Sequence, residues 1–262
     1  MKVVPAFLLA TVLILGGCSA GKSVVKDHKI TFLSPQAVLQ TIDPVIGKEP
    51  AFKFTAKVSA ISPSAKLIFK LAIITQAPDR LRIESIPVFG PPDFFFASQD
   101  GWFQIYLPAS RDFFVGAATP DNLSRALPVS LSWPARRWVT VLQGRPDIPQ
   151  NCRNIKGKME GAFYRLDVSI ENAGIDRYWI NTKNGCLERI EYTGMDGLTS
   201  KIDYSSFKEV KGRNLPLSIN IDAGDGTKIL IMNDTPEVMK QSEENRFALL
   251  PPADATLKDF PN

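Results

Sequence analysis

The sequence has few of the residues on which enzymes and zinc sites most often depend, with one histidine and three cysteines in 262 residues. A Ser-His-Asp triad would have to use His28, close to the N-terminus. The sequence spacings of metal ligands are also missing. No two residues among Cys18, His28, Cys152 and Cys186 are separated by such a spacing. We therefore expect no catalytic residues, no metal site and no cofactor.

Two further features are missing: a strong charge of one sign, and a long hydrophobic run outside the N-terminus. The formal net charge is +4, too small and too scattered to indicate a nucleic-acid partner. A content of 44% hydrophobic and 22% charged residues is typical of a globular chain and excludes a disordered one. The apolar run from Val3 to Leu15 is shorter than the roughly 20 residues that span a bilayer.

The N-terminus has the features of a secretory leader, with a basic start at Lys2, a short apolar run and small residues after it. Leu15-Gly16-Gly17-Cys18 also resembles the bacterial lipobox. That resemblance implies cleavage before Cys18, attachment of a diacylglycerol to its thiol and acylation of the new amine. The alternative is an ordinary signal peptide with a chance cysteine.

We expect a leader at 1–17, a lipidated N-terminus and tether at 18–31, and a single domain at 32–262. Two or three acyl chains on Cys18 would make a stable membrane anchor. Ser19 in the next position resembles the default signal for delivery to the outer membrane. The expected location is therefore the periplasmic face of a bacterial outer membrane.

Most of the mature chain has the two-residue period of β-strands. In the first such segment, Phe52, Phe54 and Ala56 alternate with polar residues. Short polar or glycine turns separate the segments, which indicates antiparallel neighbours. We predict about 11 to 12 strands, drawn from 51–59, 66–75, 80–86, 93–98, 102–107, 112–116, 152–160, 162–170, 175–182, 186–193, 200–208, 215–221 and 227–232.

Three amphipathic segments have the period of helices instead. The first begins at Ser34-Pro35, the second at Thr119-Pro120, and the third at Ser132-Trp133-Pro134 with a stop at Gly144. A helical pair inserted midway in an antiparallel sheet is an α+β arrangement, here mainly β. The fold class expected is a single curled antiparallel sheet with helices on its concave side.

Two of the strand segments are apolar on both faces. In 66–75, Phe69 belongs to one apolar row while Ile68 and Ile74 belong to the other, and Phe94–Phe96 is similar. One interpretation is that these are central strands sandwiched by helices. The other is that one face lines an apolar cavity, which makes Phe69 and Phe95 cavity candidates.

Four stretches of the chain form a pattern that is similar to a known family. Leu127–Leu131 is an apolar stretch with a proline, and Arg137–Pro146 carries an Arg/Trp pair before a Gly/Pro turn. Leu215–Ile221 and Lys228–Asn233 flank a glycine turn near the C-terminus. With the lipobox and the order of helix, strands, helices and strands, they resemble LolB, the outer-membrane lipoprotein receptor of the LolA/LolB-like half-barrel superfamily. The second set of strands is longer than in LolB, which leaves a sister lineage open.

The resemblance implies an incomplete β-barrel whose apolar interior, covered by helices, binds the acyl chains of lipoproteins or other lipids. Such a protein accepts cargo from a periplasmic LolA-like carrier and inserts it in the outer membrane, without any catalytic group. We expect it to act as a monomer. The alternative is a structural or assembly lipoprotein that uses the same fold to bind a protein partner or an envelope polymer.

The resemblance also assigns a role to two residues, and two tryptophans are further candidates. LolB has a protruding apolar loop whose exposed leucine acts in membrane insertion, and by position this role falls to Phe89, with Val88, in the segment 86–92. The alternative is a loop tip that folds back onto the core. Trp133 and Trp138 either cover the mouth of the cavity or are ordinary core aromatics.

The two cysteines of the domain invite a disulfide, because the periplasm is oxidising. Cys152 and Cys186, however, each begin a predicted strand, and the two strands run in opposite directions. In such a meander the thiols lie at opposite ends of the sheet, on the order of 20 Å apart and beyond the reach of a bridge. We therefore expect both cysteines to be free.

Overall fold

The structure is a computed structural model, and it describes residues 34–42, 49–63, 65–127, 131–148, 152–171, 174–239 and 246–260. The predicted leader at 1–17 and the lipidated segment at 18–31, with Cys18, lie outside the described residues and remain predictions. The described part of the predicted domain forms one sheet of 15 strands and three α-helices.

The first half of the chain supplies α1 (Pro35–Ile42), β1 (Phe52–Ile61), β2 (Lys66–Gln76), β3 (Arg80–Ser85), β4 (Phe95–Gln99), β5 (Trp102–Leu107), β6 (Asp112–Ala117), α2 (Pro120–Ala126) and α3 (Ala135–Gln143). The second half supplies β7 (Cys152–Glu160), β8 (Phe163–Ile170), β9 (Gly174–Asn181), β10 (Leu187–Thr193), β11 (Thr199–Val210), β12 (Arg213–Asp222), β13 (Lys228–Asn233), β14 (Glu237–Val238) and β15 (Thr256–Asp259). The helices and the long strands agree with the sequence-based prediction to within a few residues.

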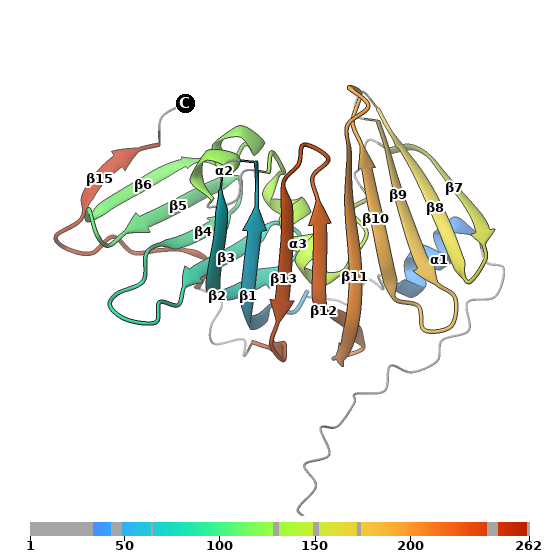
Figure 1. Cartoon of the computed structure of the whole chain (residues 1–262), viewed down its shortest axis with the longest axis horizontal. Coiled ribbons are helices and arrows are strands. Elements are labelled where there is room, and N and C mark those ends of the chain that lie inside the picture. Colours follow the sequence, from blue (N-terminus) through green and yellow to red (C-terminus); the bar gives the residue numbers. More distant parts are fainter. Residues whose placement is uncertain are drawn as a thin grey trace, which may run out of the picture.

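The sheet is curled and unclosed, with β15 and β7 at its two edges (Figure 1). Its order is β15-β6-β5-β4-β3-β2-β1-β13-β12-β11-β10-β9-β8-β7, with β14 paired to the start of β1. Neighbours are antiparallel except β15, which runs parallel to β6. The predicted antiparallel, incomplete barrel is confirmed. The segments taken from the sequence correspond to β1 through β13, and the strand count exceeds the predicted 11 to 12 in part because β14 and β15 are too short to show a periodic pattern.

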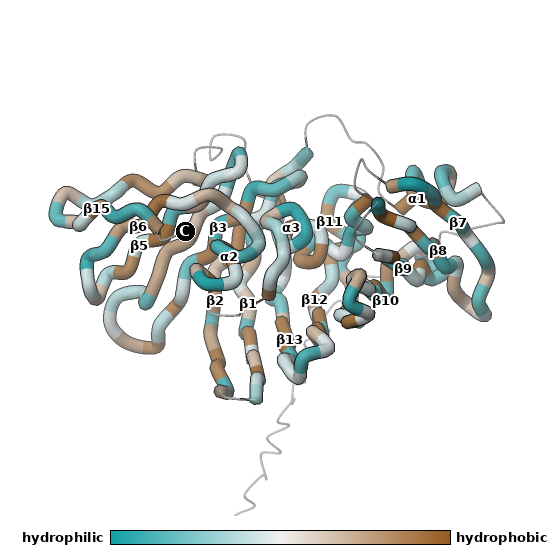
Figure 2. Tube along the Cα trace, turned by 90° about the horizontal axis from the view of Figure 1, so that it is seen from above, coloured by the Kyte–Doolittle hydropathy of each residue, from teal (hydrophilic) through white to brown (hydrophobic). Residues whose placement is uncertain are grey.

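The three helices lie on the same side of the sheet, within its curve (Figure 2). Thr119 caps α2 by accepting a hydrogen bond from the backbone N–H of Asn122, as expected of Thr before Pro. Gly144 ends α3 with a φ of 63°, and an added Cβ would lie 2.9 Å from Pro216 Cδ. Glycine is therefore needed there both for the left-handed conformation and for space.

The alternation along each strand decides which face of the sheet becomes the core. On β1, Phe54, Ala56 and Val58 are buried on the concave side, while Lys57 and its outward neighbours meet solvent. The inward residues of the sheet and of α3 form one cluster of buried side chains. Helix α3 lies over β2, β3 and β12, so its apolar side fills the curve of the sheet.

The strands that are apolar on both faces are not sandwiched by helices. On β4, Phe96 belongs to the concave core, whereas Phe95 packs on the outer face with Ala97, Phe113 and Leu249. Leu249 comes from the C-terminal segment, which covers this part of the outer face. The outer face of β2 is partly open, with Ile68 59% exposed. Sequence periodicity identified the second apolar rows but not what covers them.

Candidate functional site

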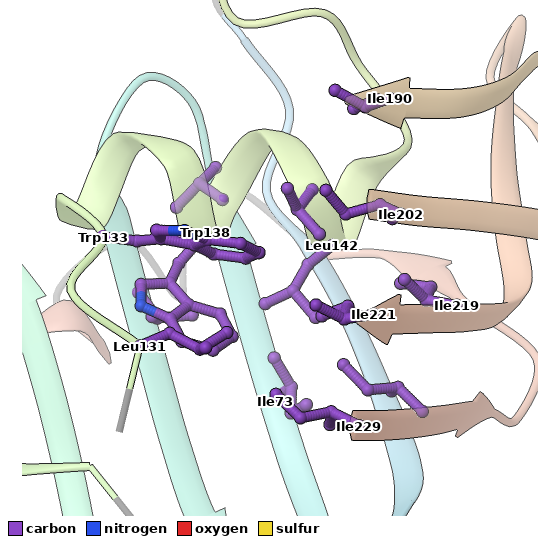
Figure 3. Packing of buried hydrophobic residues seen from close by; sticks show 14 of the residues in the cluster. Ile73, Leu131, Trp133, Trp138, Leu142, Ile190, Ile202, Ile219, Ile221 and Ile229 are labelled. Carbon is purple, nitrogen blue, oxygen red and sulfur yellow. The ribbon is translucent and has the colours of Figure 1, made fainter. Parts of the chain in front are cut away.

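The candidate site is the concave face of the sheet with helix α3 above it (Figure 3). Isoleucines of neighbouring strands form its floor, among them Ile73, Ile221 and Ile229, all nearly fully buried. Leu142 of α3 points down onto this floor. In this conformation the concave face is packed with the protein's own side chains, and a ligand that entered it would have to displace some of them.

Trp133 and Trp138 occupy the middle of this packed region. Their ring centroids lie 5.1 Å apart, and Trp133 meets the ring of Tyr192 edge-on at 6.0 Å. Both tryptophans are buried, at 5% and 6% exposure. The structure thus brings these two predicted residues together under α3, where they pack as core aromatics in the position that a lid would occupy.

Polar contacts fix the start of α3 to the far arm of the sheet. The Arg137 guanidinium lies 3.9 Å from the centroid of the Tyr192 ring and 3.5 Å from the Asp176 carboxylate. Tyr178 donates a hydrogen bond to the backbone carbonyl of Asp147, 2.7 Å away, and Arg136 pairs with the Asp147 carboxylate at 2.6 Å. These contacts link a helix to strand β9, about 40 residues further along the chain.

Burial dominates the electrostatics of this network. It raises the pKa of Asp176 to about 6, although the nearby Arg137 charge acts in the opposite direction. Burial likewise raises the pKa of Tyr192 far above the usual value. The carboxyl group of Asp176 therefore changes its charge close to neutral pH.

Three buried donors on the concave face are left without a hydrogen-bond partner among the described residues: Trp138 Nε1, Tyr192 Oη and Tyr204 Oη. Leaving a buried donor unpaired is unfavourable, so such groups in a native fold need an explanation. They belong to the buried cluster of the concave face, where the Tyr192 ring also contacts the Arg137 guanidinium.

The end of α3 is held by a second set of contacts. Gln143 donates from Nε2 to Thr75 Oγ1 at 3.1 Å, and both side chains are buried. Glu49 accepts two hydrogen bonds from Arg213, at 3.0 and 2.9 Å, and lies 3.4 Å from Arg145. Arg145 comes directly after Gly144, the C-cap of α3, so this group fixes the direction in which the chain leaves the helix.

The loop between β3 and β4 carries Val88 and Phe89 at its tip, 87% and 91% exposed. Its base is tied to the sheet: Ile86 N–H donates to the Lys70 carbonyl at 2.7 Å, and Ser85 Oγ accepts from Asp93 N–H at 2.6 Å. The tip is thus held away from the core. The alternative that it folds back onto the core does not apply, and its role in membrane insertion stays a prediction.

The remaining candidates are divided between the two faces. Phe69 packs at the rim of the concave core, half-buried, whereas Phe95 lies on the outer face under the C-terminal segment. Phe95 is therefore not part of the concave site. Cys152 and Cys186 are both free thiols, as expected from the directions of β7 and β10. Burial raises the pKa of Cys186 to about 12.

Within the described ranges, no group of three or more His, Cys, Asp or Glu side chains is arranged to hold a metal ion. None of the helices described is long and apolar enough to cross a membrane.

Sequence reasoning missed the partners of Arg137. The Arg/Trp pair was visible in the sequence, but its contacts with Asp176 and Tyr192 join positions too far apart for local patterns to connect. One signal was present: Asp176 stands at an inward position of β9, two residues before the buried Tyr178. A carboxylate on the apolar face of a strand needs a partner, and a nearby arginine is the usual one.

The curled sheet with its helical insert on the concave side is the LolA/LolB-like half-barrel, and this chain has that fold. A LolA superfamily protein of Nitrosomonas europaea superposes with a TM-score of 0.59 at 12% identity, over 83% of this chain and 98% of that one. A DUF1329 family protein of Desulfovibrio piger gives 0.57 at 11% identity, over 82% and 95%.

A domain of Vibrio parahaemolyticus named for outer membrane lipoprotein sorting is similar too, with a TM-score of 0.56 at 11% identity over 76% of this chain and 89% of that one. No protein-family model matches the chain, and no curated protein matches its sequence. The likeness is therefore one of fold.

Proposed function

We propose that this chain is an outer-membrane-anchored lipoprotein that binds acyl chains on the concave face of its half-barrel. In this role it accepts lipoproteins from a soluble periplasmic carrier and inserts them in the outer membrane. The observation that carries the proposal is the concave face itself. It is a continuous apolar surface covered by three helices of only 8, 7 and 9 residues.

Acyl chains bind there when α3 and the two tryptophans move off the floor of the site. Each square ångström of apolar surface hidden from water contributes about 25 cal/mol, so a bound acyl chain can replace the contacts that α3 gives up. The unpaired donors Trp138 Nε1, Tyr192 Oη and Tyr204 Oη then bind ester carbonyl oxygens of the cargo.

Release into the membrane is assigned to the loop tip. Val88 and Phe89 are exposed apolar side chains on a loop whose base is tied to the sheet. Pro87, Pro91 and Pro92 restrict the backbone on both sides of the tip, so holding it outward loses little entropy. Phe89 enters the interfacial region of the bilayer and opens a path from the concave face.

Cargo transfer from a soluble carrier tests the proposal directly. A chain that begins at Ala20, with its fold first verified by circular dichroism, is mixed with a LolA-like carrier loaded with a radiolabelled lipoprotein. We expect the label to move to the acceptor and acyl lipid to appear in its extract by mass spectrometry. Failure of a folded acceptor to take up any lipoprotein or lipid would contradict the proposal.

Phe89→Glu separates uptake from release. A charged side chain resists leaving water, so the variant should fold and accept cargo as the wild type does while releasing it more slowly into liposomes. Leu257→Glu, at a 66% exposed position on β15, is the matched control and should release cargo at the normal rate. Equal release rates for Phe89→Glu and the wild type would remove the loop from the mechanism.

The anchor has its own test. Cys18→Ala should block lipidation and leave the chain in its precursor form, because the thioether requires the cysteine thiol. Mass spectrometry of the membrane fraction distinguishes the forms. A Cys18→Ala chain that is still cleaved after Gly17 and still carries lipid would contradict the lipoprotein assignment.

The packed concave face favours a second candidate, a structural or assembly lipoprotein that binds a protein partner or an envelope polymer. Such a protein has no need to open its core. It would show no extractable acyl lipid and no uptake from a carrier, while remaining anchored through Cys18.

A further inference from the structure

The outer face of β1, β2 and β13 combines exposed apolar side chains with lysines. These residues alternate with the buried core positions, so they point away from the concave site. We call this surface the basic apolar patch, and it consists of Lys57, Ser59, Ile61, Lys66, Ile68, Lys70, Lys228, Leu230 and Met232. Its four apolar members are all exposed, with Ile68 at 59% and Met232 at 47%.

The register of the strands arranges the patch in rows across the sheet. Lys57 of β1 stands directly opposite Lys70 of β2 and Met232 of β13. In the next row Ser59 stands between Ile68 and Leu230, and in the last row Ile61 stands between Lys66 and Lys228. Charged and apolar side chains are thus interleaved over three adjacent strands.

This arrangement is unfavourable for the isolated fold. Like charges placed opposite each other on neighbouring strands repel, and Lys57 faces Lys70. Among the described carboxylates none lies within ion-pair distance of Lys57, Lys66 or Lys70, while Lys228 pairs with Asp222 at 3.7 Å. Asp93 and Asp234 line the same hollow as Lys57 and Lys70 without pairing with either lysine. Positive charge and apolar surface are therefore presented together.

The patch adjoins the loop that carries Phe89. A hollow of about 720 Å³ is lined by Lys57, Ile68, Lys70, Met232 and Val88, among others. The loop tip and the patch therefore border the same depression on the outer side of the sheet. A flat partner that touches the tip can reach the patch as well.

We propose that the basic apolar patch docks this protein on the surface of a bilayer that contains anionic lipid. The lysine ammonium groups bind lipid phosphates, and the side chains of Ile61, Ile68, Leu230 and Met232 enter the interfacial region between the headgroups. Basic residues flanking apolar ones on one face are what an anionic membrane surface attracts. The proposal deepens the membrane role of Phe89, and it rests on the proposed function only in placing the chain at a bilayer.

Docking through this face fixes the orientation of the half-barrel. The concave site then faces away from the lipid. The loop between β3 and β4 lies at the border between the concave site and the bilayer. The lysines confer a requirement for negatively charged headgroups, which an apolar loop tip alone does not explain.

Lysine acetylation of the full-length chain in vesicles tests the proposal. The protein is reconstituted in phosphatidylcholine vesicles with or without phosphatidylglycerol, treated with a water-soluble acetylating reagent and analysed by mass spectrometry. We expect Lys57, Lys66 and Lys70 to react several-fold more slowly when phosphatidylglycerol is present. Lys156 and Lys158, exposed on the edge strand β7, are internal controls and should react at the same rate in both vesicles.

Ile68→Asn with Leu230→Asn supplies a matched variant, since both positions are exposed and neither contributes to the core. The variant should lose the protection of the three lysines while Lys156 and Lys158 stay unchanged. Equal acetylation of patch and control lysines in both vesicles would overturn the proposal. Protection that persists without anionic lipid, or that depends on protein concentration, would also overturn it, because a protein partner or a second copy would then cover the patch. The assay measures no cargo transfer, so its outcome is independent of whether the chain accepts lipoproteins.

Discussion

Strand β13 carries apolar residues on both faces, and the two sets lie in different surroundings. Ile229 and Ile231 point into the concave core and are almost fully buried, whereas Leu230 and Met232 point outward and are exposed. The four residues are similar in type and consecutive in sequence. Strand alternation places the two pairs on opposite faces, and the curl of the sheet with α3 buries only one of them. One pair therefore stabilises the fold while the other is available to a partner.

The outer face of the second arm shows a different solution. On β8 to β11 that face carries ion pairs between neighbouring strands and along them, such as Arg165 with Asp167 at 2.9 Å and Arg189 with Asp203 at 2.7 Å. There most of the charges shown lie in ion pairs of opposite sign, and the surface is suited to water. The basic apolar patch, with opposed lysines and exposed isoleucine, is the exception on the same sheet.

The largest effect expected from this comparison is a difference in the loss of stability caused by alanine substitution at two adjacent residues. Ile231→Ala removes a buried side chain and should lower the free energy of unfolding by about 2 to 5 kcal/mol. Leu230→Ala, on the other face, should change it by no more than about 0.5 kcal/mol. Urea unfolding of the two variants measures both values, and similar losses would show that the outer face is part of the core.

Asp176 tests the polar part of the concave site. Its pKa of about 6 exceeds the unfolded value of 3.8, so between these pH values the folded chain holds a proton that the unfolded chain releases. The stability contributed by this group is therefore present below about pH 4 and falls by about 3 kcal/mol as the pH rises through 6.

The asparagine side chain of the Asp176→Asn variant cannot lose a proton. The variant should therefore not show this decrease in stability as the pH rises. The free energy of unfolding of the wild type minus that of the variant should decrease from pH 4 to pH 7 in urea titrations. Asp203→Asn, on the outer face, controls for the general effect of removing a carboxylate. A difference for Asp176→Asn that does not depend on pH would show that burial does not govern this group.

The sequence predicted the fold because the curled sheet depends on local signals. Strand alternation, the Thr119-Pro120 cap and the Gly144 stop each act within a few residues, and the structure agrees with all three. The short strands β14 and β15 escaped prediction because they exist only through pairing with β1 and β6.

The site was predicted only in part, because much of it depends on contacts between residues that are distant in the sequence. Phe89 at a loop tip stands out in the sequence, as do Trp133 just before helix α3 and Trp138 within it. The placement of Phe95 on the outer face could not be predicted, because its cover is the distant residue Leu249. The basic apolar patch also depends on register: Lys57 and Lys70 meet only when β1 and β2 pair in this alignment.

The ion pairs of the second arm should contribute little to stability, in contrast to the core. Arg189→Ala breaks its 2.7 Å contact with Asp203, but both side chains are more than one third exposed. Surface pairs of this kind contribute about 0 to 1 kcal/mol. We expect a loss of that size in urea unfolding, smaller at high salt. A loss as large as that of Ile231→Ala would show that the network, and not the apolar core, holds this arm together.

The smallest effect expected is an increase in stability, whereas the alanine substitutions in the core and in the ion pairs lower it. Lys57 faces Lys70 directly, so Lys57→Thr removes a repulsion and places a β-branched residue in a strand. The free energy of unfolding should rise by a few tenths of a kcal/mol, about 0.2 to 0.5, and the gain should fall as salt screens the charges. Lys201→Thr, which removes a lysine paired with Asp203 at 3.4 Å, should show no such gain. If Lys57→Thr lowered stability instead, the lysine would have a folding role, and the contrast between the patch and the ion-paired arm would lose its energetic basis.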